Sequence, residues 1–220
     1  MQVHPGFEKA KELIDQGAIG ELFYVESEYA HDYRFVIPDA SNWRADPQRS
    51  GFLGGGCHAV DLLRWIAGDP LEVMAYANKK MLRYLPTDDC TISILKFPHE
   101  VIGKVFVSIG CKRDYTMRSA FYGSKGTIVA DNTSPFITLY QESLNGGELF
   151  GCGTEEIPIR YPVALGNHNT IGEIADFVEA IVTGKPVKTD ALQGAATVAA
   201  CLAVLDSVRL GAPVRPDYAF

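Results

Sequence analysis

The apolar residues of this chain recur at helical spacing in four segments. In residues 57–67, Val60, Leu63 and Ala67 mark one apolar side of a helix. The same spacing predicts three further helices, over residues 5–16, 170–183 and 191–210. A capping box, Thr170–Glu173, predicts the start of the third helix.

Elsewhere the pattern changes to the short, Val-, Ile-, Phe-, Tyr- and Thr-rich runs that are typical of strands. Strands are predicted over residues 22–30, 72–78, 90–97, 101–109, 117–122, 127–130 and 136–140, with one more near 156–160 in an otherwise irregular stretch, 145–165. Most connections between them are too short for the crossovers that parallel neighbours need, so we expect antiparallel pairing. This order of elements predicts a single α+β domain over residues 1–220: an open, mainly antiparallel sheet with helices on one face.

One predicted strand carries apolar residues on both faces. Val105, Val107 and Ile109 point to one side and Phe106 to the other. A sheet face without helices would then expose apolar area, which a second subunit often covers. We therefore expect this face of the sheet to be covered at least partly by a second subunit.

Composition narrows the class of protein. The 220 residues are 47% apolar and 21% charged, which is ordinary for a globular chain and too apolar for disorder. A net charge of −7 without a Lys/Arg cluster argues against nucleic acid as a partner. Five cysteines without a C-x-x-C pair argue against structural zinc and suit free thiols in a cytoplasmic protein. No apolar run approaches about 20 residues, so no transmembrane helix and no membrane partner are expected.

Candidate chemistry centres on the glycine-rich residues 51–56 and on His58, which follows them. The run does not match a dinucleotide fingerprint or a phosphate-binding loop, because it follows a polar segment and lacks a Gly-Lys-Ser/Thr ending. The free backbone N–H groups and the dipole at a helix start would disfavour the charged imidazolium form of His58. A neutral imidazole in an open, glycine-walled pocket could then accept or donate a proton. Asp61, one turn on, could orient it. A capping or packing role for His58 is the alternative.

The polar segment 31–50 is long for a loop without its own structure, which is typical of functional loops. Trp43 beside Arg44 combines a flat apolar surface with a fixed cation, suited to a ring or an anion. A surface loop held by one buried Trp explains the same residues. The charged residues 112–114 either face a cleft or face water.

Together these residues resemble the C-terminal domain of the glucose–fructose oxidoreductase / inositol dehydrogenase (Gfo/Idh/MocA) family of NAD(P)-dependent oxidoreductases. The resemblance covers essentially the whole chain. It is carried by Phe7-x-x-Ala10-Lys11-x-Leu13-Ile14-x-x-Gly17-x-Ile19-Gly20-Glu21, Asn42-Trp43-Arg44, Gly56-x-His58-x-x-Asp61-Leu62, Tyr122-Gly123-Ser124-Lys125-Gly126-Thr127, and Phe177-Val178-x-Ala180-Ile181 before an Ala-rich helix.

The resemblance implies a dihydrodipicolinate-reductase-like fold and a substrate pocket for a sugar, polyol or related carbinol. It implies His58 as the catalytic proton-transfer residue. Trp43, Arg44, Asp61 and His168 would bind the substrate. The open sheet would carry the contacts between the subunits of a homodimer or homotetramer.

The resemblance also implies parts that this sequence does not show. Family members carry an N-terminal Rossmann domain for NAD or NADP, which ends in a Glu-Lys-Pro segment with an active-site lysine. We expect that domain to be absent here and no cofactor to bind this chain alone. Many members have an Asp four residues before the active-site His, and here that position is Gly54.

Three interpretations therefore remain open. The first is the substrate-binding domain of a nicotinamide-dependent oxidoreductase, inactive without its cofactor domain. The second is a catalytically inactive binding or assembly domain that pairs through its open sheet face. The third, least favoured, is a metal enzyme that uses Cys57, His58 and Asp61, which lie too close in sequence to form a site without further ligands.

Overall fold

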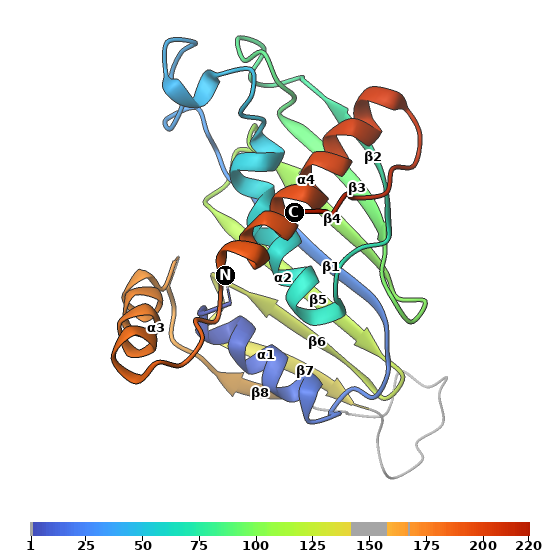
Figure 1. The fold of residues 1–220 in the computed structure, drawn as a ribbon, viewed down its shortest axis with the longest axis vertical. Helices are drawn as coiled ribbons and strands as arrows, with labels where there is room; N and C mark the ends of the chain where they lie inside the picture. Colours follow the sequence, from blue (N-terminus) through green and yellow to red (C-terminus); the bar gives the residue numbers. More distant parts are fainter. Residues whose placement is uncertain (1, 142–157, 167) are drawn as a thin grey trace.

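Eight strands form one sheet in the computed structural model, which describes residues 2–141, 158–166 and 168–220 (Figure 1). They are β1 (Leu22–Ala30), β2 (Glu72–Asn78), β3 (Cys90–Lys96), β4 (Ile102–Ser108), β5 (Thr116–Gly123), β6 (Gly126–Asp131), β7 (Phe136–Gln141) and β8 (Ile159–Pro162). The bounds of β1 and β2 are those predicted, those of β3 and β7 differ by one residue at one end, and those of β4, β5 and β6 differ by one residue at each end. Part of the predicted loop and the start of the last predicted strand lie outside the described residues.

The strand order is β2-β3-β4-β1-β5-β6-β7-β8, so β1 lies inside the sheet. It pairs antiparallel with β5 but parallel with β4, with Ser27 opposite Val105. The expectation of antiparallel neighbours is therefore wrong at this one pair. The reason is that β4 neighbours a strand far from it in sequence, and the intervening α2, β2 and β3 supply the crossover that parallel pairing needs.

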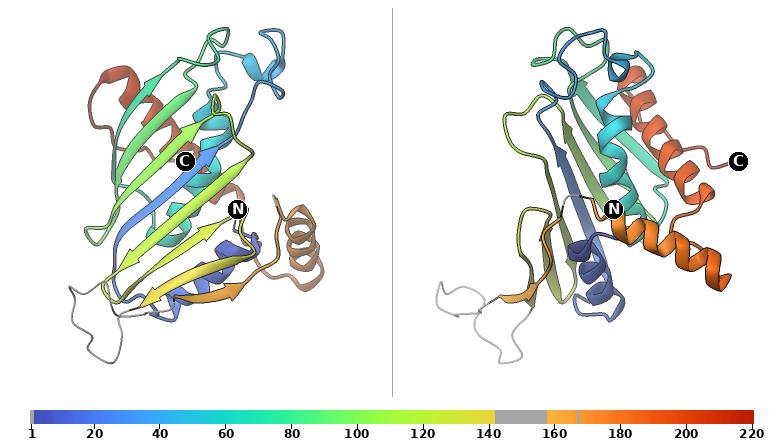
Figure 2. Two further views of the ribbon diagram at one scale, coloured as in Figure 1. Left: turned by 180° about the vertical axis from the view of Figure 1, so that it is seen from behind. Right: turned by 90° about the vertical axis from the view of Figure 1, so that its left-hand side faces the viewer.

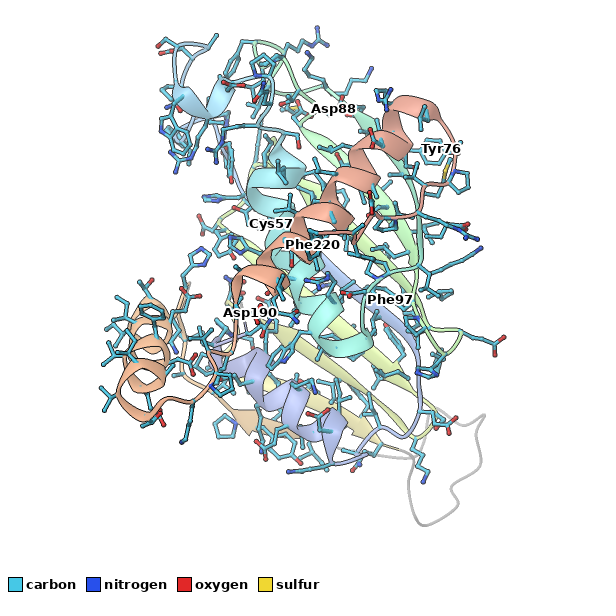
Figure 3. The ribbon with its side chains drawn as sticks, viewed as in Figure 1. Cys57, Tyr76, Asp88, Phe97, Asp190 and Phe220 are labelled. Carbon is cyan, nitrogen blue, oxygen red and sulfur yellow. The ribbon has the colours of Figure 1, made fainter. Side chains whose placement is uncertain are left out.

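All the helices lie on one face of the sheet, as predicted (Figure 2). They are α1 (Pro5–Asp15), α2 (Cys57–Ala67), α3 (Thr170–Thr183) and α4 (Ala191–Leu210), with a 3-10 turn, η1 (Trp43–Ala45), and a π-helical turn, η2 (Phe52–Gly56). Helix α1 covers β6 and β7, α2 covers β1, and α4 crosses β2 and α2. Figure 3 labels Cys57 at the start of α2 and Asp190 at the start of α4.

Side chains cap the starts of α3 and α4. The Asp190 carboxylate accepts a hydrogen bond from the amide of Gln193, which satisfies a free N–H of α4. The predicted capping box at Thr170 is wrong by one residue, because the cap of α3 is Asn169. The Asn169 side-chain oxygen accepts from Gly172 N at 3.1 Å, and its Nδ2 donates to the carbonyl of Val3.

The face of the sheet without helices is apolar at one edge and charged in the middle. Its exposed apolar side chains on β2, β3 and β4 are Tyr76, Ile92, Ile94 and Ile102. At its centre the Lys104 ammonium lies 2.5 Å from the Glu26 carboxylate. The predicted apolar open face is therefore present among the described strands.

Helix α4 is long and apolar enough, by length and composition, to cross a membrane, with a mean hydropathy of 1.6 over its best window. This differs from the expectation drawn from the sequence. One face of α4, including Ala200, Cys201 and Val204, is buried against the rest of the fold. The core helix of a folded domain satisfies the same test, so this one helix is weak evidence for a membrane span.

Candidate active site

The glycine-rich segment before His58 is helical. Its π-helical turn runs directly into α2, so the open loop predicted here is wrong. Gly51, Gly55 and Gly56 lie against the sheet, where a Cβ on any of them would come closer than 3.0 Å to a sheet-side residue. These glycines let the start of the helix approach the sheet. Gly54 differs, because nothing lies within 4 Å of the Cβ it would carry.

His58 lies inside this continuous helix, so the argument from a helix start does not apply. The side chain is half-buried. Burial is the main reason that the pKa of His58 falls to about 4, and the neighbouring His168 acts in the same direction. The imidazole is therefore neutral at pH 7, as expected from the sequence but for a different reason. A neutral imidazole keeps one nitrogen free to accept a proton.

The His58 ring is one of four rings in which each contacts the next, so that they form a closed cycle. We call them the ring cluster: Tyr29, His58, Tyr115 and His168. Ring centroids lie 6.0 Å apart for His58 and Tyr29, and 5.2 Å apart for Tyr29 and Tyr115. Tyr115 stacks on His168 at 5.3 Å and 19°, and His168 lies 5.2 Å from His58. The cluster joins β1, α2 and the residues that precede β5 and α3. The structure thus brings the predicted residues His58 and His168 together.

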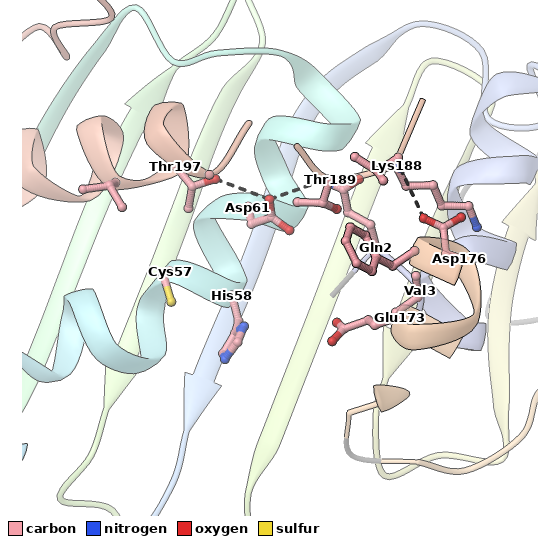
Figure 4. Close-up of a pocket in the computed structure, with 14 residues that line it drawn as sticks. Gln2, Val3, Cys57, His58, Asp61, Glu173, Asp176, Lys188, Thr189 and Thr197 are labelled. Atoms are coloured by element: carbon pink, nitrogen blue, oxygen red, sulfur yellow. Dashed lines mark hydrogen bonds between the residues drawn. The ribbon is translucent and has the colours of Figure 1, made fainter. Parts of the chain in front are cut away.

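His58 also lines a cavity of about 470 Å³ between α2, α3 and the start of α4 (Figure 4). Asp61 lines the same cavity, and its Oδ1 accepts hydrogen bonds from Gln2 Nε2 at 3.2 Å and from Thr197 Oγ1 at 3.3 Å. The wall therefore combines an imidazole and a carboxylate one helical turn apart. The volume falls in the range of small-molecule sites.

Trp43 and Arg44 line a different part of the fold. The Trp43 ring is more than half exposed and lies 4.3 Å and 4.2 Å from the guanidinium carbons of Arg44 and Arg49. Both arginines line a second, small cavity with Tyr33 and Gly54. The alternative of a surface loop held by a buried Trp is wrong, because the Trp43 ring is exposed. The contact of Arg44 with this ring was not predicted from the sequence.

The described residues do not fit a dinucleotide or a metal. The amide groups of residues 51–56 belong to a helical segment, and three of the four glycines there are covered by the sheet, so no open phosphate cradle is formed. No group of three His, Cys, Asp or Glu side chains could hold a metal within the described part of the chain. The four described cysteines are free thiols, and Cys152 lies outside the described residues.

Sequence reasoning did not find Tyr29, Tyr115 or His31 as site residues. Tyr29 lies in a predicted strand, where a Tyr is common and indicates no site. Tyr115 precedes another strand, far from His58 in the sequence. The weak signal was the end of β1, where Tyr29, His31 and Tyr33 follow one another at alternate positions. Only the pairing of β1 with β5 brings them beside residue 115.

The family model described as the GFO/IDH/MocA C-terminal domain matches residues 7–129, and the chain belongs to this family. Inositol 2-dehydrogenase 2 of Saccharopolyspora erythraea is 25% identical over 216 residues, which is 96% of this chain and 58% of that protein. D-xylose 1-dehydrogenase (NADP+) of Haloarcula marismortui is 37% identical over 62 residues, 28% of this chain and 16% of its own length.

A solved structure of levoglucosan dehydrogenase in complex with NADH and levoglucosan has the same fold. The TM-score is 0.83 at 20% identity, covering 98% of this chain and 64% of that one. This chain therefore spans about three fifths of the inositol dehydrogenase and of this structural relative. The predicted family and the predicted fold class are both confirmed.

Proposed function

We propose that this chain is the substrate-binding domain of an NAD(P)-dependent oxidoreductase that acts on a sugar, polyol or related carbinol. The observation that carries the proposal is the neutral His58 at the edge of the ring cluster, in a cavity of small-molecule size. Family membership and the names of the sugar and inositol dehydrogenases support the substrate class.

In this proposal His58 handles the proton. Oxidation of a carbinol removes a hydride from carbon and a proton from oxygen, so a proton acceptor must face the hydroxyl. A neutral imidazole can accept that proton, whereas burial disfavours the imidazolium that forms. His168 is exposed and its ring adjoins His58, so it can take the proton onward to water.

The nicotinamide would come from a separate dinucleotide-binding domain, since the described residues form no phosphate cradle. We assign the docking of that domain to α3. Ile171, Ile174, Phe177, Ile181 and Val182 are each at least 58% exposed, and Ala180 is the one buried residue of this helix. Such a row of large apolar side chains beside the cavity suits a protein surface rather than water. NAD or NADP would then lie against the cavity that His58 lines.

The open sheet face would pair with a second copy of the chain. Tyr76, Ile92, Ile94 and Ile102 supply its apolar edge, and the ion pair of Lys104 with Glu26 supplies a polar centre. This combination is typical of subunit interfaces. We propose a homodimer or homotetramer in the cytoplasm.

The alternative is a catalytically inactive assembly domain. Gly54, where many family members have an acidic residue, favours it, because the open position next to this glycine supplies no second acid or base. The two functions differ in ligand binding. Only the first needs a sugar to bind at the cavity.

A sugar titration separates the two functions. Levoglucosan, D-xylose and myo-inositol are added to the chain labelled with 15N-histidine, and the His58 and His168 imidazole signals are followed by NMR. We expect at least one probe to shift both signals saturably, and His58→Ala to weaken its binding. Self-association without a shift from any probe would favour the assembly domain. An NADH titration in parallel is expected to give no saturable binding up to millimolar cofactor.

A further inference from the structure

Two arginines in the segment between β1 and α2 share one aromatic ring. The guanidinium carbons of Arg44 and Arg49 lie 4.3 Å and 4.2 Å from the centre of the Trp43 ring. Within the described residues neither guanidinium forms an ion pair, and the carboxylate of Asp46, between them in the sequence, accepts from the amide of Gln48. Because like charges repel, two cations held beside one ring are stabilised best by an anion that both can reach.

The small cavity that these arginines line has a volume of about 30 Å³. The charged side chains of its described lining are Arg44 and Arg49, both positive, and Tyr33, Ser50 and Thr87 add hydroxyl groups. The Ser50 hydroxyl accepts a hydrogen bond from a backbone amide at 3.0 Å, which leaves its own hydrogen to be donated. Positive charge together with O–H donors suits the oxygens of an anion.

The two positive charges also act on the inner wall of this cavity, where Tyr33 is buried. Burial is the main reason that the pKa of Tyr33 is raised, whereas its hydrogen bond with Tyr29 and the charges of Arg44 and Arg49 act in the opposite direction. An anion in the cavity would therefore feel both charges in surroundings that are partly shielded from water.

Gly54 leaves room for such an anion. It lines the same cavity as the two arginines, and nothing lies within 4 Å of the Cβ that it would carry. Gly54 and His58 are four positions apart in one continuous helical segment, so they lie about one turn, roughly 5–6 Å, from each other. A group bound beside Gly54 is thus separated from His58 by a distance comparable with the width of a sugar ring.

We propose that Arg44 and Arg49 bind a carboxylate of the ligand in the cavity beside Gly54, so that the substrate is a sugar acid rather than a neutral sugar. About 30 Å³ accepts two water-sized groups, which matches the two oxygens of a carboxylate and is small for the three terminal oxygens of a phosphate. The carboxylate site stands without the proposed function, whereas the placing of the sugar ring toward His58 rests on it.

Matched pairs of sugars test this site. D-glucuronate and D-glucose differ only in the group at C6, as do D-galacturonate and D-galactose. Each is titrated at constant ionic strength into the chain labelled with 15N-tryptophan and 15N-histidine, and the Trp43 indole and His58 imidazole signals are followed by NMR. Since hydrogen bonds to a charged group are the strong ones, we expect at least one acid to shift the Trp43 signal saturably, with a Kd at least about 10-fold lower than that of its neutral partner.

Substitutions in the cavity separate charge from size. Arg44→Gln and Arg49→Gln should each weaken binding of the acid about 5- to 10-fold and leave the neutral sugar unchanged. Gly54→Asp places a carboxylate in the open space beside both arginines and should abolish the preference for the acid. Gly54→Asn has nearly the same size without the charge, so this control should keep the preference. Arg34→Gln, at an arginine that pairs with Asp32, should change neither Kd.

The outcomes distinguish this site from the proposed function. Equal binding of acid and neutral sugar, or a preference that survives in both Arg44→Gln and Arg49→Gln, would overturn the carboxylate site, and a shift of His58 by either sugar would then leave the proposed function standing. A shift of Trp43 by an acid, without a shift of His58 by any sugar, would support the site and count against the proposed function. Tighter binding of D-glucose 6-phosphate than of D-glucuronate would overturn the choice of a carboxylate. No binding of any probe would contradict both proposals.

Discussion

Gly55 lies directly against the ring of Tyr29: a Cβ on this glycine would be 2.4 Å from Tyr29 Cε1. One contact therefore sets both the depth at which the helix packs on the sheet and the position of a ring beside His58. Gly54, its neighbour in the same π-helical turn, has open space around it. The two glycines form a matched pair for substitution.

Gly55→Ala should destabilise the fold by about 1–3 kcal/mol, because the added methyl group forces the helix or Tyr29 to move. Gly54→Ala should be neutral or stabilise by up to about 1 kcal/mol, since alanine favours a helical backbone. Urea unfolding of both variants measures the difference. Equal stability of the two variants would contradict the close packing described here.

The low pKa of His58 makes the stability of the fold depend on pH. Its folded value, about 4, lies below the ordinary value of 6.5 for an unfolded chain. Between these values the unfolded chain binds a proton that the folded chain does not, so the free energy of unfolding falls as pH decreases from 6.5 to 4. The full effect is about 3 kcal/mol.

His58→Gln removes this titrating group. Because all other titrating groups are present in both proteins, the difference between the variant and the unmodified chain isolates the contribution of His58. The stability that the chain loses between pH 7 and pH 4.5 should be smaller in the variant by about 2–3 kcal/mol. Urea unfolding at the two pH values measures it. Parallel losses in the two proteins would mean that His58 titrates normally in the folded state.

Arg64 links α2 to α4 from a buried position. Its guanidinium donates to Thr197 Oγ1 at 2.6 Å, to the Gln193 carbonyl at 2.9 Å and to Asp69 at 2.7 Å. Arg64→Met should cost about 1–3 kcal/mol, since it leaves the buried Thr197 hydroxyl without its donor and removes the bonds to Gln193 and to the half-exposed Asp69. Arg64→Lys should recover only part of this, because an ammonium cannot reproduce the fork of donors. Thermal unfolding distinguishes the three proteins, and full recovery by lysine would show that charge alone is needed.

In the turn between β3 and β4, two residues other than glycine have backbone angles in the left-handed region: His99, with φ 57°, and Glu100, with φ 60°. Asn-Gly is the preferred pair for such a two-residue hairpin turn. Replacing both with His99→Asn and Glu100→Gly should stabilise the fold by about 1 kcal/mol or more. Glu12→Gly, in the middle of α1, is the control and should destabilise by about 1 kcal/mol. A loss of stability in the double variant would contradict the strained turn.

Helix α3 should open more easily than the rest of the described fold. Ala180 is its one buried residue, whereas α2 buries five. Backbone amides of α3 should therefore exchange with solvent orders of magnitude faster than those of α2, in a native-state hydrogen-exchange experiment. If the amides of α3 and α2 were equally protected from exchange in dilute protein, another part of the same chain would have to cover α3.

The elements of this fold could be predicted from the sequence because each has its own periodic pattern. The bounds of β1, α2 and α4 follow from alternation, helical spacing and the glycines that end the helices. The pairing of β1 with β4 could not be predicted in this way. It joins residues about eighty positions apart, and nothing near either strand specifies the partner.

The site was partly predictable for the same reason. His58 and His168 stand out in the sequence as histidines beside predicted helix starts, and the structure brings their ring centroids to 5.2 Å from each other. The role of Gly55 was misread, because a glycine that allows a turn and one that allows close packing look alike in a sequence. Tyr115 is visible only after the strands are paired.

The central position of β1 also constrains how the chain can fold. Two meanders, β2-β3-β4 and β5-β6-β7, can form from neighbouring segments alone, because each closes short turns. Of the eight strands, β1 is made first but lies between the two meanders, so its pairing needs residues that are made much later. Until then both meanders keep an unpaired edge. We expect the step that joins the two meanders through β1 to be the slow one, because it forms contacts between residues far apart in the sequence. The same step brings Tyr29 beside Tyr115.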